Sequence, residues 1–401
     1  MPGADETTFA AELRRLRGTV TLRELGRRAS CSKSIISDLE HARRSPTLPI
    51  ALGLDKALGA GGTLVSLAQR QRLSEETAEA ASDSAEDGLL REWDDVWRRD
   101  FLKGVGAAAL TTGLKTGSMA AAGGRDLLDA HIALRAAHGR LDNLRGASAV
   151  YPHAVGHHQQ ILAWHATAAA AERQQIAALA ADTGGFVGFL TYDLGMAENA
   201  AAHYRDAAAH ARQAGDLSCC VNLIGQMSRI LTDQGHYQRA LTLADGALHL
   251  AGTKAHPAVR SWLHAVRAHH YACLGDARTT QKDLTTAWKL LDHADDGETP
   301  PYVGYLSPAE LNKWTGHAMV RLGQQTPSFL RAGQAALDEA RATWPATIVR
   351  GSAEVLTASA RIYAARGDRD TAADLASQAV AIATETGSAR NLRAALTAST
   401  G

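Results

Sequence analysis

Residues 21–46, TLRELGRRASCSKSIISDLEHARRSP, decide how the N-terminal part of this 401-residue chain folds. Apolar residues recur at helical spacing on both sides of a short break: Leu22, Leu25 and Ala29, then Ile35, Ile36 and Leu39. The break contains Ser32, whose hydroxyl can accept a backbone N–H and so begin the second helix. The stretch therefore predicts a helix, a tight turn and a second helix.

The outward face of the second helix has the composition of a DNA-reading surface. It carries Lys33, Ser34, Ser37 and Asp38. Short polar side chains and one lysine, on a helix braced by another helix, suit base edges in the major groove. The alternative is that they are ordinary solvated residues of a small bundle. The agreement of motif, order and charge favours DNA binding.

The same segment resembles the Cro/C1-type (XRE-like) helix-turn-helix family. The run from Ser32 to Glu40, S-x-x-x-I-S-x-x-E, carries the resemblance together with Arg43, Arg44 and Pro46, and residues 5–68 are covered. The resemblance implies base contacts by the four residues of the outward face, Lys33, Ser34, Ser37 and Asp38, and phosphate contacts by Thr21, Arg43 and Arg44, with Arg23 also among the DNA-binding residues.

One position departs from the family pattern. The glycine usual after the recognition helix is replaced by Ala42. Because a residue in the left-handed conformation is cheapest as glycine, we expect this turn to differ.

Charge is unevenly distributed along a chain whose formal net charge is zero. Residues 14–44 contain nine Arg or Lys and three acids, a local charge of +6, which suits a phosphate backbone. Residues 71–97 contain nine acids and two arginines. These patterns predict a DNA-binding domain at 1–69, a flexible acidic and then Gly/Ala-rich linker at 70–124, and a second domain at 125–401.

Several function classes receive no support. The four cysteines form no C-x-x-C pair, which favours a reduced cytoplasmic protein without a structural metal. We expect no signal peptide, no membrane span, no cofactor and no enzymatic activity, because the corresponding motifs are missing. His153 and His157 have the i, i+4 spacing of metal ligands on a helix, but Pro152 and Gly156 disfavour a helix there. Surface or packing roles are the favoured interpretation.

The second domain contains a repeat. Five glycines serve as its reference points: Gly195, Gly235, Gly275, Gly323 and Gly367. Seven positions before each stands a small residue, and twelve positions after each stands alanine. Small residues let paired helices approach closely, as in an α-solenoid. The pattern resembles tetratricopeptide repeats, although its spacing exceeds their 34 residues. The predicted fold is therefore all-α, a helix-turn-helix bundle followed by a solenoid of helix pairs.

The resemblance implies that the first helix of each pair lines a concave groove. The residues nominated for ligand contact there are Asn222, Gln226, Arg229, Trp262, His269, Trp314, His317 and Arg361. Arginine, histidine and amide side chains suit a peptide with a free carboxylate or a small acidic molecule. The competing interpretation is that they form only the hydrated face of a solenoid.

Together these features predict a cytoplasmic, sequence-specific DNA-binding regulator that acts as a homodimer on double-stranded DNA. The combination resembles helix-turn-helix and tetratricopeptide regulators that respond to secreted peptides, and the Ala/Arg/Gly-rich composition is typical of a high-GC actinobacterial source. The rival hypothesis is an interaction scaffold whose repeats bind a partner protein, with DNA contact secondary.

Overall fold

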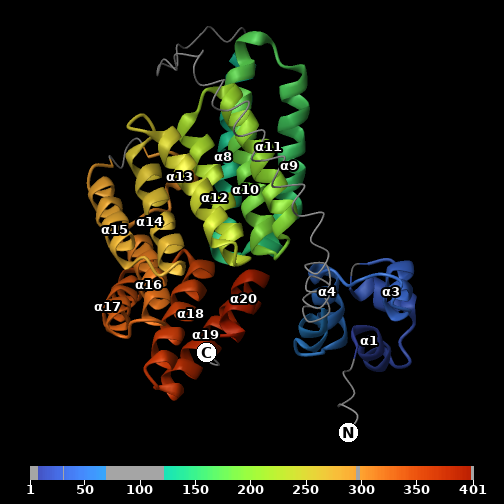
Figure 1. Ribbon diagram of the computed structural model, residues 1–401. Coiled ribbons are helices and arrows are strands. Elements are labelled where there is room, and N and C mark those ends of the chain that lie inside the picture. The colour runs from blue at the N-terminus through green and yellow to red at the C-terminus, as the bar shows by residue number, and fades with distance from the viewer. Residues whose placement is uncertain (1–7, 30, 69–121, 295–298, 399–401) are drawn as a thin grey trace. The chain divides into compact units, whose positions relative to one another are not determined.

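The computed structural model describes residues 8–29, 31–68, 122–294 and 299–398. The chain divides into two units, residues 1–113 and 114–401, which are considered separately. Within the described residues the regular secondary structure is helical and contains no strand (Figure 1). The all-α prediction is thus confirmed. Most of the predicted linker at 70–124 lies outside the described residues.

The first unit is a small helical bundle around one apolar core. Its helices are α1 (Phe9–Arg17), α2 (Leu22–Arg28), α3 (Lys33–Glu40) and α4 (Leu48–Leu58), and residues 63–68 are also helical. The core gathers side chains from all five segments: Phe9, Leu13, Leu25, Ile36, Leu39, Leu54 and Leu64. The predicted inward residues of α2 and α3 lie in or against this core, so the sequence pattern fixes which face of α3 remains in solvent.

Hydroxyl side chains start the first three helices. Thr8, Thr21 and Ser32 accept hydrogen bonds from the N–H groups of Ala11, Glu24 and Ile35, respectively. Each bond satisfies one of the donors left free at a helix N-terminus. The Ser32 cap is the one that the sequence predicts.

The turn after α3 contains the expected departure. Ala42 has φ of 53°, so alanine occupies the left-handed region that glycine adopts more easily. It is the only non-glycine residue with positive φ among the described residues. The turn therefore keeps its left-handed residue in spite of the Cβ atom.

The second unit is a succession of antiparallel helix pairs. Its helices are α8 (Ala122–Arg145), α9 (Ala147–Thr167), α10 (Ala170–Asp193), α11 (Ala197–Ala214), α12 (Leu217–Asp233), α13 (Tyr237–Ala251), α14 (Pro257–Cys273), α15 (Ala277–Leu291), α16 (Pro308–Gly323), α17 (Ser328–Thr343), α18 (Val349–Ala365), α19 (Arg369–Glu385) and α20 (Ala389–Leu396). A single 3₁₀ turn, η2 (Pro301–Val303), precedes α16.

Glycines end the inner helices at most of the predicted turns. Gly195, Gly235, Gly275 and Gly367 have φ between 80° and 86°. The following N–H groups bond back to the preceding helix, as when His236 donates to the Leu231 carbonyl at 2.8 Å. These are the bonds of a Schellman motif, which needs a left-handed residue.

The fourth unit of the repeat departs from the predicted register. Gly323 lies inside α16, where an added Cβ would overlap the Leu330 side chain, and α17 begins only at Ser328. Ala335 is consequently exposed, while Gly333 and Leu337 take buried positions. The extra residues between α16 and α17 shift this helix relative to its counterparts.

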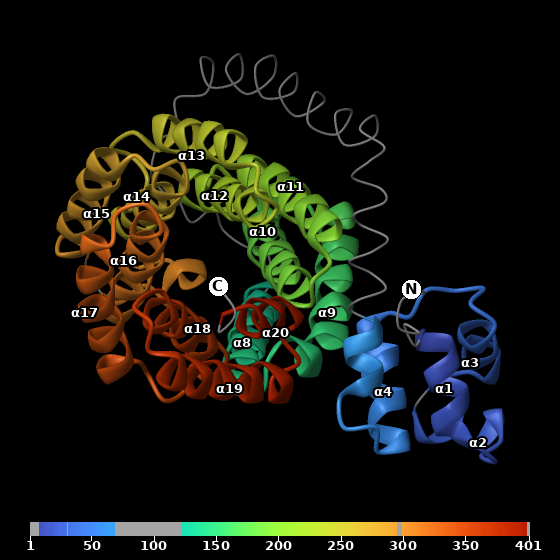
Figure 2. The same cartoon turned by 60° about the horizontal axis from the view of Figure 1, so that its bottom comes forward.

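The helix pairs curve into a closed ring (Figure 2). The even-numbered helices α10 to α18 line its inside, and the odd-numbered helices α11 to α19 form its outside. At the seam, α8 and α10 meet α18 and α20. The Ser388 hydroxyl donates to an oxygen of Asp193 at 2.8 Å, and Gly146 lies directly against the backbone of Thr386. A solenoid predicted as an open array is thus joined end to end.

The histidine-containing segment is helical after all. Helix α9 runs through Pro152 and Gly156. His157 stacks on His131 of α8, with ring centroids 5.1 Å apart. Burial lowers the pKa of His157 to about 4, so the imidazole is neutral at pH 7. No set of three or more potential metal ligands occurs among the described residues.

Candidate nucleic-acid interface and ring cavity

Helix α3 presents the outward face that the sequence nominates. Lys33 and Ser34 are exposed, and Ser37 and Asp38 are half-buried. The opposite side of the helix is anchored, because Ile36 is fully buried in the core. These four polar residues therefore form one accessible strip on a rigid support, as a helix that enters the major groove requires.

An ion pair fixes α3 against α1. The Arg17 guanidinium donates to both carboxylate oxygens of Glu40, at 2.5 Å through Nε and 3.1 Å through Nη2. Arg17 also donates to the Val20 carbonyl at 2.9 Å. Glu40 is only 4% exposed, so this bidentate pair is largely removed from water. It holds the C-terminal end of the DNA-reading helix in place.

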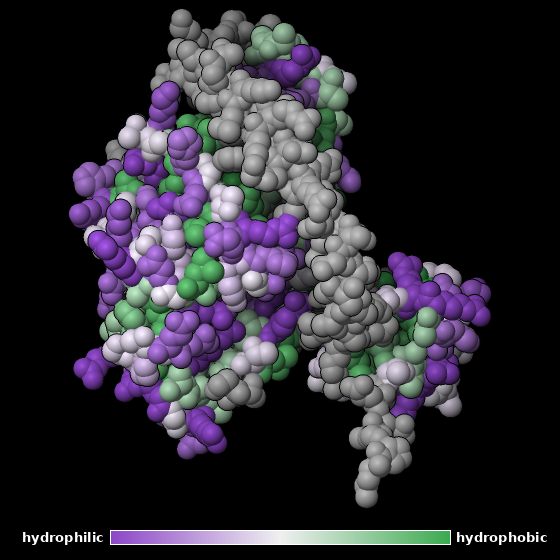
Figure 3. Space-filling view, viewed as in Figure 1, coloured by the Kyte–Doolittle hydropathy of each residue, from purple (hydrophilic) through white to green (hydrophobic). Residues whose placement is uncertain are grey.

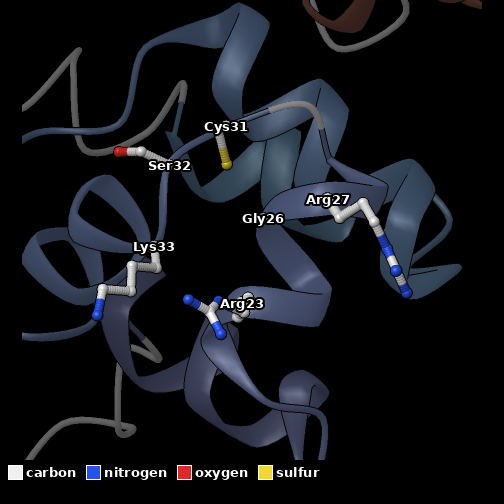
Figure 4. Close-up of a pocket in the computed structure, with 6 residues that line it drawn as sticks. All are labelled: Arg23, Gly26, Arg27, Cys31, Ser32 and Lys33. Carbon is white, nitrogen blue, oxygen red and sulfur yellow. The ribbon is translucent and has the colours of Figure 1, made fainter.

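A hollow separates α2 from the start of α3. It is lined by Arg23, Gly26, Arg27, Cys31, Ser32 and Lys33. Figure 4 shows Arg23 reaching into this hollow toward Lys33, whereas Arg27 turns to the other side of α2. Gly26 makes the hollow possible, since an added Cβ would stand 2.6 Å from the Cys31 carbonyl oxygen.

The basic residues of this unit fall into two groups. Arg27 and Arg28 both pair with Glu24. Among the described residues, Arg23, Lys33, Arg43 and Arg44 have no carboxylate within ion-pairing distance, and all four are exposed. Hydrophilic side chains gather over the α3 side of the unit (Figure 3). The unpaired cations are the ones available to phosphate groups.

Comparison with known families agrees with this geometry. Residues 8–68 match the model of a helix-turn-helix domain family. The first unit is accordingly a helix-turn-helix domain, the class that the α2-turn-α3 arrangement defines. No curated protein matches the chain. The domain class indicates a DNA-binding regulator.

A second site lies inside the ring of the second unit. A cavity of about 440 Å³ is lined by inner helices from α10 round to α20. Five of the eight nominated groove residues line it: Arg229, His269, Trp314, His317 and Arg361. Four of these, all except Trp314, occupy the same position in successive repeats, six residues before the reference glycine. The closed curvature of the ring brings that row together.

The other three nominated residues lie elsewhere. Trp262 is fully buried, with its indole against Gly225 of the neighbouring inner helix, so it does not line the cavity. Asn222 is 4% exposed and also lies outside the lining. Gln226 acts indirectly, because its side-chain oxygen accepts a hydrogen bond from Arg229 at 2.9 Å.

The cavity contains more positive than negative groups. Five arginines line it, and the carboxylates of Asp233 and Glu354 oppose them: Arg229, Arg321, Arg361, Arg390 and Arg393. Arg390 is paired with Glu354. Among the described residues, Arg229 and Arg361 have no carboxylate partner within 4.0 Å, and Arg361 donates only to the Ala394 carbonyl, at 3.2 Å. Burial and the neighbouring Arg321 lower the pKa of Arg361.

Aromatic rings form one wall of the cavity. The Arg229 guanidinium lies 5.2 Å from the Trp314 ring centroid, and the His317 ring lies 6.0 Å from it. Burial lowers the pKa of His317 to about 3, so its imidazole is neutral near pH 7. The wall therefore offers apolar surface beside fixed positive charge.

The ion-pair network of the seam adjoins the cavity. Glu354 pairs with Lys313 at 3.1 Å and with Arg390. Arg350 bridges to Asp142 and Asp193 at 3.4 and 3.6 Å. Burial would raise the pKa of Glu354, but the surrounding cations, Arg390 first among them, hold it well below its usual range. The same charged cluster thus closes the ring and borders the cavity.

Sequence reasoning did not nominate Glu354 or Arg390 as site residues. Glu354 stands at the same distance from its reference glycine as Asn222, thirteen positions before it, and that offset was the available signal. Arg390 belongs to α20, beyond the last reference glycine. No helix among the described residues is both long and apolar enough to span a bilayer.

Proposed function

We propose that this protein is a sequence-specific transcriptional regulator whose helix-turn-helix domain binds operator DNA. The observation that carries the proposal is the exposed polar strip of α3 with four unpaired cations around it. Lys33, Ser34, Ser37 and Asp38 face base edges, and Thr21, Arg23, Arg43 and Arg44 hold the phosphate backbone.

The regulator acts as a homodimer, because one recognition helix covers only a half-site. Helix α8 supplies a supporting observation. Leu127, Leu134 and Leu141 follow one another at seven-residue spacing and are 41–46% exposed. Leucines at that spacing suit pairing with a second helix. Leu134→Glu should shift the sedimentation coefficient toward the monomer, whereas Leu274→Glu, at an equally exposed leucine, should not.

The second unit senses a peptide or a small acidic ligand and transmits its presence to the DNA-binding domain. The cavity inside the ring and its excess of arginines support this role. The rival scaffold hypothesis needs no DNA preference, and the selection experiment below separates the two.

The test is selection of enriched sequences from random duplexes by the full-length protein at two salt concentrations. A regulator enriches a motif. Lys33→Ala should relax preference at one base position at a cost of about 1–3 kcal/mol. Arg43→Ala should weaken binding to all sequences alike and reduce the salt slope by about one unit. Arg366→Ala, an exposed arginine of the second unit, is the control and should change neither.

Absence of an enriched motif at both salt concentrations would contradict the regulator proposal and favour the scaffold. If Lys33→Ala weakened all sequences equally, α3 would contact the backbone but not the bases. That result would overturn the assignment of α3 as the reading helix.

A further inference from the structure

We propose that the ring cavity binds a compact organic anion, a small molecule with one carboxylate or phosphate head and a flat apolar body, rather than an extended peptide. This inference rests on the proposed ligand-sensing role of the second unit and names the class of ligand. It follows from three features of the cavity: its unpaired cations, an unpaired hydroxyl and its closed shape.

The first feature is the pair of arginines without carboxylate partners. Arg229 and Arg361 lie on α12 and α18, on different sides of the ring, and both line the cavity. A guanidinium held away from water is stable when an anion accompanies it. Glu354 cannot serve both, because it already pairs with Lys313 and Arg390. An oxyanion accepting from Arg229 and Arg361 would supply the missing charge.

The second feature is a polar group with no partner. The Thr357 side chain lines the cavity and is only 2% exposed, yet its hydroxyl has no hydrogen-bond partner among the described residues. Buried hydroxyls in native proteins are nearly always bonded. Thr357 lies on the same helix as Arg361, one turn earlier, so one ligand head can reach both.

The third feature is the shape of the site. The seam between Asp193 and Ser388 closes the ring, so the inner surface does not continue as an open groove. A cavity of about 440 Å³ suits a small molecule. Trp314, with Arg229 over its ring, provides a flat apolar wall for the body of such a ligand.

The test uses a fluorescent anion and its uncharged counterpart. 8-Anilinonaphthalene-1-sulfonate is titrated into the full-length protein without DNA, and N-phenyl-1-naphthylamine, which lacks the sulfonate, is titrated in parallel. We expect the anion to bind at one site per chain and at least tenfold tighter than the amine. Arg229→Gln and Arg361→Gln should each weaken the anion at least tenfold and leave the amine unchanged. Arg331→Gln, at an exposed arginine on outer helix α17, should have no effect.

Displacement identifies the ligand class. N-acetyltryptophan and phenyl phosphate should displace the fluorescent anion, and their relative strength distinguishes a carboxylate site from a phosphate site. A ten-residue peptide that ends in tryptophan should not displace it. Equal displacement by this peptide would overturn the proposal in favour of an extended groove. Equal binding of the anion and the amine, or binding unaffected by both arginine changes, would also overturn it.

Thr357→Val separates the hydroxyl from the fold, since valine keeps the shape of threonine. We expect the free protein to melt at the same or a higher temperature and the anion to bind more weakly. A lower melting temperature with unchanged affinity would overturn the assignment of Thr357 to the ligand. Because no DNA is present, failure here leaves the DNA-binding proposal intact, and failure to enrich a motif leaves this one intact.

Discussion

The closure of the ring can be tested at one glycine. Gly146 has φ of 80°, and a Cβ added there would stand 2.6 Å from Thr386 Cβ and 2.7 Å from its carbonyl carbon. Gly235 has nearly the same φ, 85°, but nothing lies within 4 Å of its added Cβ. Alanine at either position therefore has the same backbone cost, and only Gly146→Ala also forces the seam apart.

The expected sizes follow from these two contributions. A left-handed alanine costs about 1–2 kcal/mol, partly offset because alanine restricts the unfolded chain, so Gly235→Ala should lower the free energy of unfolding by about 1 kcal/mol. Overpacking adds about 1–3 kcal/mol, so Gly146→Ala should lower it by about 2–4 kcal/mol. Urea unfolding followed by circular dichroism measures both. Equal destabilisation by the two variants would refute the reasoning that Gly146 and Thr386 are in contact in solution.

Two further predictions concern single residues. Ala42→Gly should raise the melting temperature of the helix-turn-helix domain, a gain of about 1 kcal/mol, because glycine relieves the left-handed alanine; a decrease in a thermal melt would contradict this account of the turn. His270 is fully buried, bonded to Ser228 and Thr232, and burial lowers its pKa to about 3. A lowered histidine pKa means that stability is complete above the unfolded pKa of about 6.5 and is lost as pH falls toward 3, so at pH 5 His270 should contribute a loss of about 2 kcal/mol. His270→Gln should reduce the loss of urea stability between pH 7 and pH 5 by that amount, and an unchanged pH dependence would show that another group is responsible.

Local features of the first unit could be predicted because they depend on neighbours in sequence. The Ser32 cap bonds to Ile35, three residues away, and the burial of Ile36 follows from helical spacing. The pair between Arg17 and Glu40 could not be predicted in this way. Its partners are 23 residues apart, and their contact depends on how α1 packs against α3.

The repeat shows the same limit. Turn glycines and the row of Arg229, His269, His317 and Arg361 recur at fixed offsets, so the sequence could place them on one side of the inner helices. The offset failed at Gly323, because alanine at 335 fits an exposed position as well as a buried one. Closure of the ring depends on contacts between the first and last helices, which a rule of nearest neighbours does not contain.

The seam also bears on how this protein emerges from the ribosome. Asp193 waits for Ser388, which follows it by 195 residues, and Ser148 meets Thr386 across 238 residues. At about 5–20 residues per second, roughly 10–40 seconds separate synthesis of the Asp193 and Ser388 partners. During that interval the carboxylates of α8 and α10 face water without Arg350 and Arg390. Nascent chains stalled before α18 should therefore be captured by chaperones and cut by proteases more readily than released ones.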